Sequence, residues 1–265
     1  MSARLEARGV RLAYEGRVVA SDLSLAVPDG SFTVVVGPNA CGKSTLLRAF
    51  SRLLRPQAGA VVLDGAAIAS YRPKEAARRV GLLPQSATAP EGITVGDLVA
   101  RGRYPHQGLV RQWSAADEVA TTDAMLATGV EELRDRLVED LSGGQRQRVW
   151  VAVALAQQTP LLLLDEPTTY LDVSHQVELL DLFADLHEAG TTVVAVLHDL
   201  NHAARYATHL VVMKGGAVVT AGAPADVLTA GLVEDVYGLA CVVVPDPVTG
   251  TPMVVPRGRE SRRSR

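Results

Sequence analysis

Short apolar runs, separated by polar stretches that contain glycine or proline, recur along most of this chain of 265 residues. Alternating runs are typical of half-buried strands, and continuously apolar runs are typical of strands buried on both faces. We therefore expect strands near residues 5–12, 18–27, 31–36, 61–63, 80–83, 161–164, 191–197, 209–213 and 217–220.

Helix signals occupy the segments between several of these runs. We expect helices from Lys43 to about Leu54, over 94–101, 114–128 and 173–189, and from Ser142 and Asp199 onward. Ser114 suits an N-cap and Gly190 a C-cap, because a serine hydroxyl accepts a bond from a terminal N–H and glycine adopts the left-handed conformation. Alternating strands and helices predict a mostly parallel sheet covered on both faces. The strand-poor region at about 87–140 predicts a helical insertion in this α/β core.

The composition is that of an ordinary globular protein, with 48% hydrophobic and 21% charged residues, so global disorder is not expected. The formal net charge of −3 gives no reason to expect nucleic acid as a partner. Cys41 and Cys241 are too few for a disulfide framework and suit a reducing cytosol. The N-terminus lacks an apolar signal core, and no apolar run approaches the roughly 20 residues that span a bilayer. Any transport role therefore requires other subunits.

The end of the chain differs from the rest, because arginines crowd a short polar segment after Pro256. We expect residues 257–265 to form a basic, disordered tail, with weak contact to anionic lipid headgroups as the alternative. Histidines, cysteines and carboxylates form no cluster with metal-site spacing, so no protein-bound iron or zinc is expected.

A glycine-rich loop joins the run at 31–36 to the helix expected from Lys43. It consists of Gly37, Pro38, Asn39, Ala40, Cys41, Gly42, Lys43, Ser44 and Thr45. A strand, such a loop and a helix in this order are typical of a P-loop, whose backbone N–H groups hold phosphates. We expect Lys43 to reach the β- and γ-phosphates of ATP and the Ser44 hydroxyl to hold Mg²⁺. Ala40 replaces a glycine that is common in such loops, and a small Cβ is expected to fit there.

A second glycine-rich segment carries more information than the P-loop, because it indicates that a second copy of the chain closes over the nucleotide. After Leu141 it comprises Ser142, Gly143, Gly144 and Gln145, and a helix is expected to follow. Its glycines allow the backbone to approach a phosphate, and the helix N-terminus adds N–H donors and a favourable dipole.

Paired carboxylates end the continuously apolar run at 161–164. We expect Asp165 to bind Mg²⁺ through water and Glu166 to polarise the attacking water as a general base. An acidic loop after a buried strand is the structural alternative. His198 closes the run at 191–197 and is expected at the same sheet edge, where its imidazole can contact the γ-phosphate or the attacking water.

Three further residues are candidates for the nucleotide site. Gln85 follows the run at 80–83, and its amide can contact Mg²⁺ or the attacking water. Tyr14 can stack on adenine, with an exposed loop aromatic as the alternative. Asp172, shortly after Glu166, can reach across a dimer interface.

These residues, in this order, resemble the ATP-binding subunits of ABC transporters over essentially the whole chain. The resemblance implies a RecA-like P-loop NTPase core with a small β-subdomain and an inserted helical subdomain, spanning residues 1–256 with the insertion at about 87–140. It assigns Tyr14 to the aromatic loop, Gln85 to the Q-loop, Asp172 to the D-loop and His198 to the H-switch. Ser142, Gly144 and Gln145 would contact the γ-phosphate held by the other protomer of a head-to-tail homodimer.

The resemblance also implies partners and a location. It implies integral membrane permease subunits and, through them, a substrate-binding protein, with this chain peripheral on the cytoplasmic face of the cell (inner) membrane. Residues 94–106 resemble importers of iron–siderophore, haem and vitamin B12, and residues 146–158, 168–172 and 246–252 resemble the ferric-siderophore branch. Haem or vitamin B12 is the alternative cargo. The competing functions are those of an exporter ATPase and of a non-transport ABC protein that acts on DNA or ribosomes.

Overall fold

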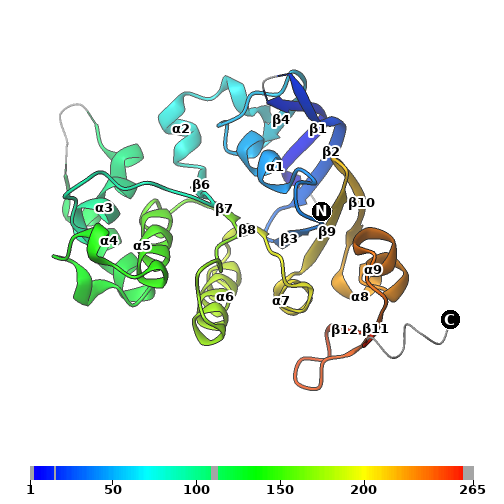
Figure 1. The fold of residues 1–265 in the computed structure, drawn as a ribbon. Coiled ribbons are helices and arrows are strands. Elements are labelled where there is room, and N and C mark those ends of the chain that lie inside the picture. Colours follow the sequence, from blue (N-terminus) through cyan, green and yellow to red (C-terminus); the bar gives the residue numbers. More distant parts are fainter. Residues whose placement is uncertain (1–2, 15, 109–112, 259–265) are drawn as a thin grey trace. The chain divides into compact units, whose positions relative to one another are not determined.

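The computed structural model describes residues 3–14, 16–108 and 113–258 (Figure 1). The chain divides into two compact units, Met1–Ile68 with Val194–Arg265 and Ala69–Val193. Residues 259–265, most of the predicted basic tail, lie outside the described residues.

The first unit contains two larger sheets and a hairpin. An antiparallel sheet has the order β2-β1-β4-β5, formed by Arg17–Pro28, Ala3–Tyr14, Ala58–Leu63 and Ala66–Ala67. A second sheet has the order β10-β9-β3-β8, formed by Ala217–Gly222, His209–Lys214, Phe32–Val36 and Thr192–Val196. The boundary between the units falls within β8. Strands β3 and β9 run parallel, whereas β9 and β10 are antiparallel.

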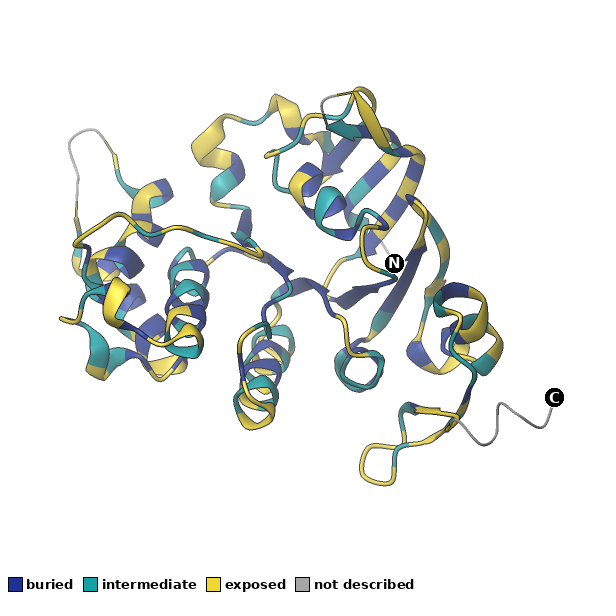
Figure 2. Ribbon diagram, in the orientation of Figure 1, coloured by how far each residue is buried: buried dark blue, intermediate teal, exposed yellow. Residues whose placement is uncertain are grey.

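Every residue of β3 and of β8 is buried, and both strands are dark blue in Figure 2. Continuous burial explains why these runs are apolar throughout rather than alternating. The strands predicted from apolar runs form in both units, with ends that differ from the prediction by a few residues.

Helices of the first unit are α1 (Lys43–Phe50), α7 (Leu200–Tyr206), α8 (Pro224–Val227) and α9 (Ala230–Tyr237). The predicted extension of the first helix to about Leu54 is wrong. Arg52 adopts a left-handed φ of 66°, and the Leu54 N–H donates to the Arg48 carbonyl at 2.9 Å. This pattern closes a helix C-terminus. After α9 the chain forms an antiparallel hairpin of β11 (Cys241–Pro245) and β12 (Pro252–Pro256), which the apolar pattern had not indicated.

In the second unit, β6 (Val80–Leu83) and β7 (Leu161–Asp165) form a parallel pair. Its helices are α2 (Pro73–Ala77), α3 (Val95–Ala100), α4 (Ala115–Ala127), α5 (Gly143–Ala156) and α6 (Val173–Glu188). Short 3₁₀ turns lie at Ile68–Ser70, Arg101–His106, Glu131–Leu133 and Val138–Asp140.

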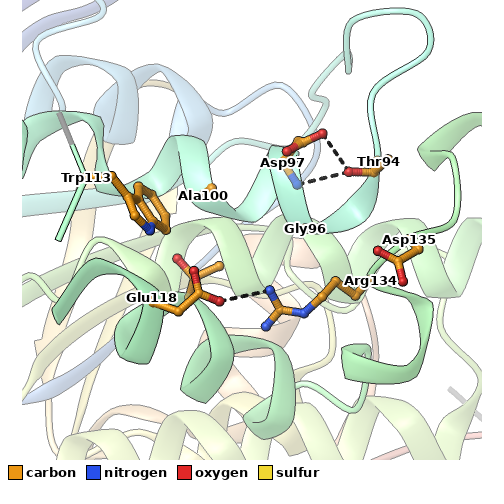
Figure 3. Close-up of a pocket in the computed structure, with 9 residues that line it drawn as sticks. Thr94, Gly96, Asp97, Ala100, Trp113, Glu118, Arg134 and Asp135 are labelled. Carbon is orange, nitrogen blue, oxygen red and sulfur yellow. Dashed lines mark hydrogen bonds and ion pairs between the residues drawn. The ribbon is translucent and has the colours of Figure 1, made fainter. Parts of the chain in front are cut away.

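The predicted helices near 94–101 and 114–128 are confirmed as α3 and α4. The predicted cap Ser114 forms a complete capping box with Asp117. Arg134 ties α4 to the turn that follows it, because its guanidinium donates to Glu118 at 3.2 Å and to Thr122 at 2.7 Å. A hollow of about 440 Å³ lies beside this ion pair, and Figure 3 shows side chains that line it. A continuous apolar cluster from α3, α4 and α5 gives this helical segment its own core.

Among the described residues, no helix has the length and apolarity needed to cross a membrane. The same residues contain no group of histidines, cysteines and carboxylates arranged to hold a metal ion.

Candidate nucleotide-binding site

The predicted P-loop lies in the first unit, between the buried strand β3 and helix α1. Gly37 ends the strand side with a φ of 154°, and a Cβ there would lie 2.2 Å from the Met213 carbonyl oxygen, so only glycine fits. Helix α1 begins at Lys43, and its N-cap is Gly42, which has no side chain with which to cap the helix. The N-terminal N–H groups of such a helix form an anion-binding end.

Lys43 is held at this loop by the loop's own backbone. Its ammonium donates to the carbonyl oxygens of Gly37 at 2.8 Å and Pro38 at 3.0 Å, and the residue is only 5% exposed. A third, long contact of 4.0 Å joins the ammonium to the Cys41 Sγ. Because sulfur is a weak acceptor, the two carbonyl bonds fix the ammonium and its third N–H can turn to a phosphate oxygen.

A turn remote in sequence supports the P-loop. The Gly216 N–H, in the β9–β10 turn, donates to the Cys41 carbonyl at 3.0 Å. In a planar trans peptide the carbonyl of one residue and the N–H of the next point in opposite directions. The bond therefore turns the Gly42 N–H away from the β9–β10 turn. Sequence reasoning missed Gly216, because its role depends on a contact with a distant segment.

Ala40 and Cys41 complete the loop. Ala40 is exposed and has a left-handed φ of 60°, a conformation that costs a non-glycine residue about 1 kcal/mol. This explains why glycine is common there and why a small side chain still fits. Cys41 is buried, and burial raises the pKa of its thiol while the Lys43 ammonium acts in the opposite direction. The thiol is therefore mostly protonated near neutral pH.

Two more predicted residues lie in the first unit. His198 is exposed and directly follows Leu197, whose N–H donates to the Val35 carbonyl of β3 at 3.3 Å. His198 and the P-loop thus follow neighbouring strands at one edge of the sheet. Tyr14 ends β1 beside α1, where Arg48 lies 5.9 Å from its ring centroid. Asp199 caps α7 by accepting bonds from two of its backbone N–H groups.

In the second unit, Gln85 and the paired carboxylates share one edge of the β6–β7 pair. Leu83 pairs with Leu164 in parallel register, so Gln85 and Asp165 both follow strand ends on the same side. Asp165 is only 3% exposed. Glu166 leaves the strand with a left-handed φ of 54°, an unusual backbone state for a non-glycine residue that is frequent at functional sites.

The signature segment forms the N-terminus of α5. The Ser142 hydroxyl accepts the Gln145 N–H at 3.2 Å, and the Gln145 side-chain oxygen accepts the Ser142 N–H at 3.0 Å. This is a complete capping box. Gly143 and Gly144 form the first turn, and a Cβ at Gly144 would lie 3.4 Å from the Leu171 side chain.

Helix α5 is also bound to the loop that follows Glu166. The buried Gln147 amide donates to the Pro167 carbonyl at 2.9 Å, a contact that sequence reasoning missed. Asp172 is the N-cap of α6, and its carboxylate accepts the His175 N–H and the Ser174 hydroxyl, both at 3.0 Å. Hydrogen bonds from the backbone and then the ring of His175, followed by Ser174, lower the pKa of Asp172. The helix of the signature is therefore bound to the loop after Glu166, and Asp172 begins the next helix.

A groove of about 350 Å³ lies on the helical part of the second unit, between the 101–106 turn and α5. Apolar side chains line much of it, including Pro90, Leu98, Tyr104, Pro105, Trp150 and Val153. The Trp150 indole nitrogen is buried and has no hydrogen-bond partner among the residues that the structure describes. Tyr104 is 63% exposed, and the Lys74 ammonium lies 4.5 Å from its ring centroid. The groove therefore combines an apolar floor with an exposed aromatic ring.

Comparisons with known proteins agree with this geometry. The family model described as ABC transporter matches residues 20–169. The chain is 56% identical over 258 residues to the ferric enterobactin transport ATP-binding protein FepC of Escherichia coli K12, covering 97% of this chain and 95% of that one. It is 44% identical over 263 residues to the hemin import ATP-binding protein HmuV of Myxococcus xanthus, covering 96% and 97%.

The fold of this chain is similar to that of a solved ABC transporter cassette. A bacterial ABC transporter cassette, solved as a dimer, superposes with a TM-score of 0.74 at 26% identity, covering 83% of this chain and 98% of that one. The predicted α/β P-loop NTPase fold is confirmed by this similarity.

Proposed function

This chain belongs to the ABC transporter family, and we propose that it is the ATP-hydrolysing subunit that powers import of ferric siderophores through a separate membrane permease. The observation that carries the cargo assignment is the higher identity to the ferric enterobactin protein than to the hemin protein. ATP hydrolysis by this subunit rests on family membership and on the P-loop described above.

ATP is held first by the P-loop. The backbone N–H groups of the loop and of the α1 N-terminus bind the phosphates, with the Gly42 N–H turned away from the β9–β10 turn by the Gly216 bond. Lys43 binds the β- and γ-phosphates from its fixed position. Tyr14, beside α1, stacks on the adenine ring.

The oxygen-rich set of Ser44, Gln85 and Asp165 suits Mg²⁺, because a hydroxyl, an amide and a carboxylate are the hard ligands that this ion prefers. Asp165 is buried at the end of an otherwise apolar strand, beside Glu166. When bound, the ion neutralises charge on the phosphates.

Hydrolysis requires an oriented water molecule. Glu166 accepts its proton as the general base, Gln85 holds it through the side-chain amide, and His198 contacts the γ-phosphate or the same water. Glu166 has a left-handed backbone, a strained state that is frequent at functional sites.

Closure of a homodimer completes two ATP sites. Ser142, Gly143, Gly144 and Gln145 of one protomer face the γ-phosphate held by the P-loop of the other, and Asp172 lies at the same interface. Because ATP contacts both protomers only in the closed state, ATP favours closure and hydrolysis releases it. The chain acts as one ATP-binding domain over residues 1–256, with its helical part at about 87–140.

The groove around Trp150 is the docking site for a short permease helix. Its apolar floor buries the helix, and the indole N–H, which has no partner among the described residues, donates to an acceptor on that helix. The chain then lies on the cytoplasmic face of the cell membrane, coupled through the permease to a substrate-binding protein. Trp150→Phe, which keeps the ring but removes the N–H, should weaken association with the detergent-solubilised permease several-fold without changing ATP binding.

The ATPase assignment is tested with two variants of the full chain. Glu166→Gln should bind ATP and accumulate as an ATP-bound dimer in gel filtration, because binding is retained and hydrolysis is not. Lys43→Ala should lose ATP binding instead. Rapid turnover by Glu166→Gln would show that another group is the general base.

The cargo is tested by uptake of labelled ferric siderophores, haem and cobalamin in cells that lack this chain. Loss of ferric siderophore uptake, restored by the native chain and not by Lys43→Ala, is the expected result. Loss of haem or cobalamin uptake alone would retain the importer function and replace the cargo. Unchanged uptake of all three would refute the importer assignment.

A further inference from the structure

The segment 246–252, which resembles the ferric-siderophore branch, forms the turn of the β11–β12 hairpin. The Asp246 carboxylate accepts the N–H groups of Val248 at 2.8 Å and Thr249 at 3.1 Å. Backbone bonds between Asp246 and Thr251 at 2.8 Å and between Gly250 and Asp246 at 2.8 Å close the turn. The turn is therefore a defined structure with an aspartate at its centre.

This hairpin is hydrogen-bonded to helix α7 at two points. The Asn201 side-chain oxygen accepts the Val254 N–H at 2.7 Å, and its amide donates to the Val254 carbonyl at 3.3 Å. One helix turn later, Arg205 pairs with Asp246 at 2.9 Å. Asn201 thus satisfies both backbone groups of one strand residue, which fixes the helix relative to the hairpin in position and orientation.

The Asn201 contact lies at the start of α7, which follows His198 in the chain. Asp199 caps the helix by accepting the N–H groups of Asn201 at 2.7 Å and His202 at 2.9 Å. Before the cap, Leu197 is bound to β3. The backbone of His198 is therefore fixed between β3 on one side and the start of α7 on the other, and Asn201 lies one helical turn away.

The outer face of the hairpin has a different character. Val242, Val244 and Val255 are exposed there, whereas Val254 on the inner face is buried. The hairpin is a thin layer whose inner face packs against α7, so its loss would free the start of that helix.

We propose that the C-terminal hairpin is a positioning element for His198, with Asn201 as the positioning residue that connects the two. This inference rests on the proposed role of His198 at the γ-phosphate. The hairpin holds the start of α7 so that the imidazole stays at the sheet edge beside the P-loop. Asn201 touches neither ATP nor the attacking water, so it should affect the rate of hydrolysis and leave ATP binding unchanged.

The test compares the ATPase kinetics of four full-length variants. Asn201→Ala should lower kcat about tenfold with KM for ATP within about twofold of the native value. Asn201→Asp, which retains the oxygen that accepts the Val254 N–H, should recover part of the rate. Val244→Thr, on the outer face of the same hairpin, is the matched control and should keep the native rate. His198→Ala measures what the imidazole itself contributes.

Two further readouts separate positioning from general stabilisation. Asn201→Ala added to His198→Ala should cause no further loss of single-turnover rate, because the effect passes through the imidazole. The proton resonance of the His198 ring, identified as the signal missing from His198→Ala, should shift in Asn201→Ala and not in Val244→Thr.

The outcomes distinguish a failure of the positioning role of Asn201 from a failure of the proposed role of His198. A native rate in Asn201→Ala, or an equal loss with and without His198, would overturn the positioning role while leaving the proposed function intact. A native rate in His198→Ala would refute the proposed role of His198, and the inference with it.

Discussion

The buried ion pair of the helical segment gives the sharpest stability prediction. Arg103 donates to Asp117 at 2.8 Å, to the Ala156 carbonyl at 2.7 Å and to the Gln158 side chain at 3.0 Å. The side chains of Arg103 and Asp117 are only 6% and 9% exposed. Arg103→Met would therefore leave a buried carboxylate without its cation and a buried carbonyl without its donor.

The cost follows from that burial. Removing one partner of a buried pair costs about 3–5 kcal/mol, which is a large part of the roughly 5–15 kcal/mol that stabilises a typical protein. At about 2–4 °C per kcal/mol for a chain of this size class, the melting temperature should fall by about 10 °C. Arg101→Met removes the same charge from an exposed neighbour and should change stability by less than about 0.5 kcal/mol.

Thermal unfolding followed by circular dichroism measures both variants. Equal melting temperatures for Arg103→Met and Arg101→Met would refute the reasoning, because the two differ in burial and not in charge. Adding Asp117→Leu to Arg103→Met should recover part of the loss, because it removes the buried charge, whereas the Ser114 capping box and the donor to the Ala156 carbonyl stay lost.

The same pair predicts a pH dependence. The Ser114 hydroxyl and then the Arg103 guanidinium hold the pKa of Asp117 below its usual range, against the opposite effect of burial. A lowered pKa in the folded state stabilises the protein above the unfolded value of about 3.9 and ceases to do so as the pH falls through the folded value. The difference in melting temperature between the native chain and Asp117→Asn should therefore shrink below about pH 4. A constant difference from pH 7 to pH 3 would contradict this account.

Three other predictions concern the nucleotide site. Gly216→Ala should weaken ATP binding at least tenfold, because its Cβ would lie 2.0 Å from the backbone oxygen of Val19. Gly215→Ala is the matched control, since Gly215 also has a positive φ but open space around its Cβ position. Equal affinities of the two variants in a fluorescent-nucleotide titration would argue against support of the P-loop by this turn. Alkylation of Cys41 should block ATP binding, and its rate should increase as the pH rises toward the raised pKa of the thiol. ATP should slow the alkylation. An equal rate of alkylation with and without ATP, measured by mass spectrometry, would contradict this prediction. Gln145→Glu should retain the helix content of the native chain but lose ATP-driven dimerisation, and normal dimerisation in light scattering would exclude the anion contact.

Apolar runs predicted the sheet strands well. Strands β3, β7 and β8 are buried along their whole length, so their sequences are almost continuously apolar. The P-loop and the signature were readable for a different reason, since each is a local segment whose glycines and helix start define its geometry. The C-terminal hairpin was not predicted. Its strands are short and edged by proline, and its stability comes from Asn201 and Arg205, which belong to a helix far away in the sequence.

The sequence also contained no sign of several contacts between single residues that lie far apart in the chain. Gly216 has no sequence feature that connects it to Cys41, and Gln147 resembles any polar residue of a helix until it is seen to donate to Pro167. Arg103 was part of a recognisable segment, yet its partner Asp117 also serves the Ser114 capping box. The roles of these residues become evident only from the folded structure.

The capping box of the signature explains why a glutamine occupies its last position. Ser142 and Gln145 use their oxygen acceptors to satisfy backbone N–H groups of α5. The groups left over are the serine O–H and the glutamine NH₂, which are both donors. A glutamate would complete the same box, but it would place a carboxylate at the end of the helix that we propose to bind a phosphate. Glutamine therefore stabilises the helix start and leaves donors there, and the positive end of the helix dipole favours the same anion.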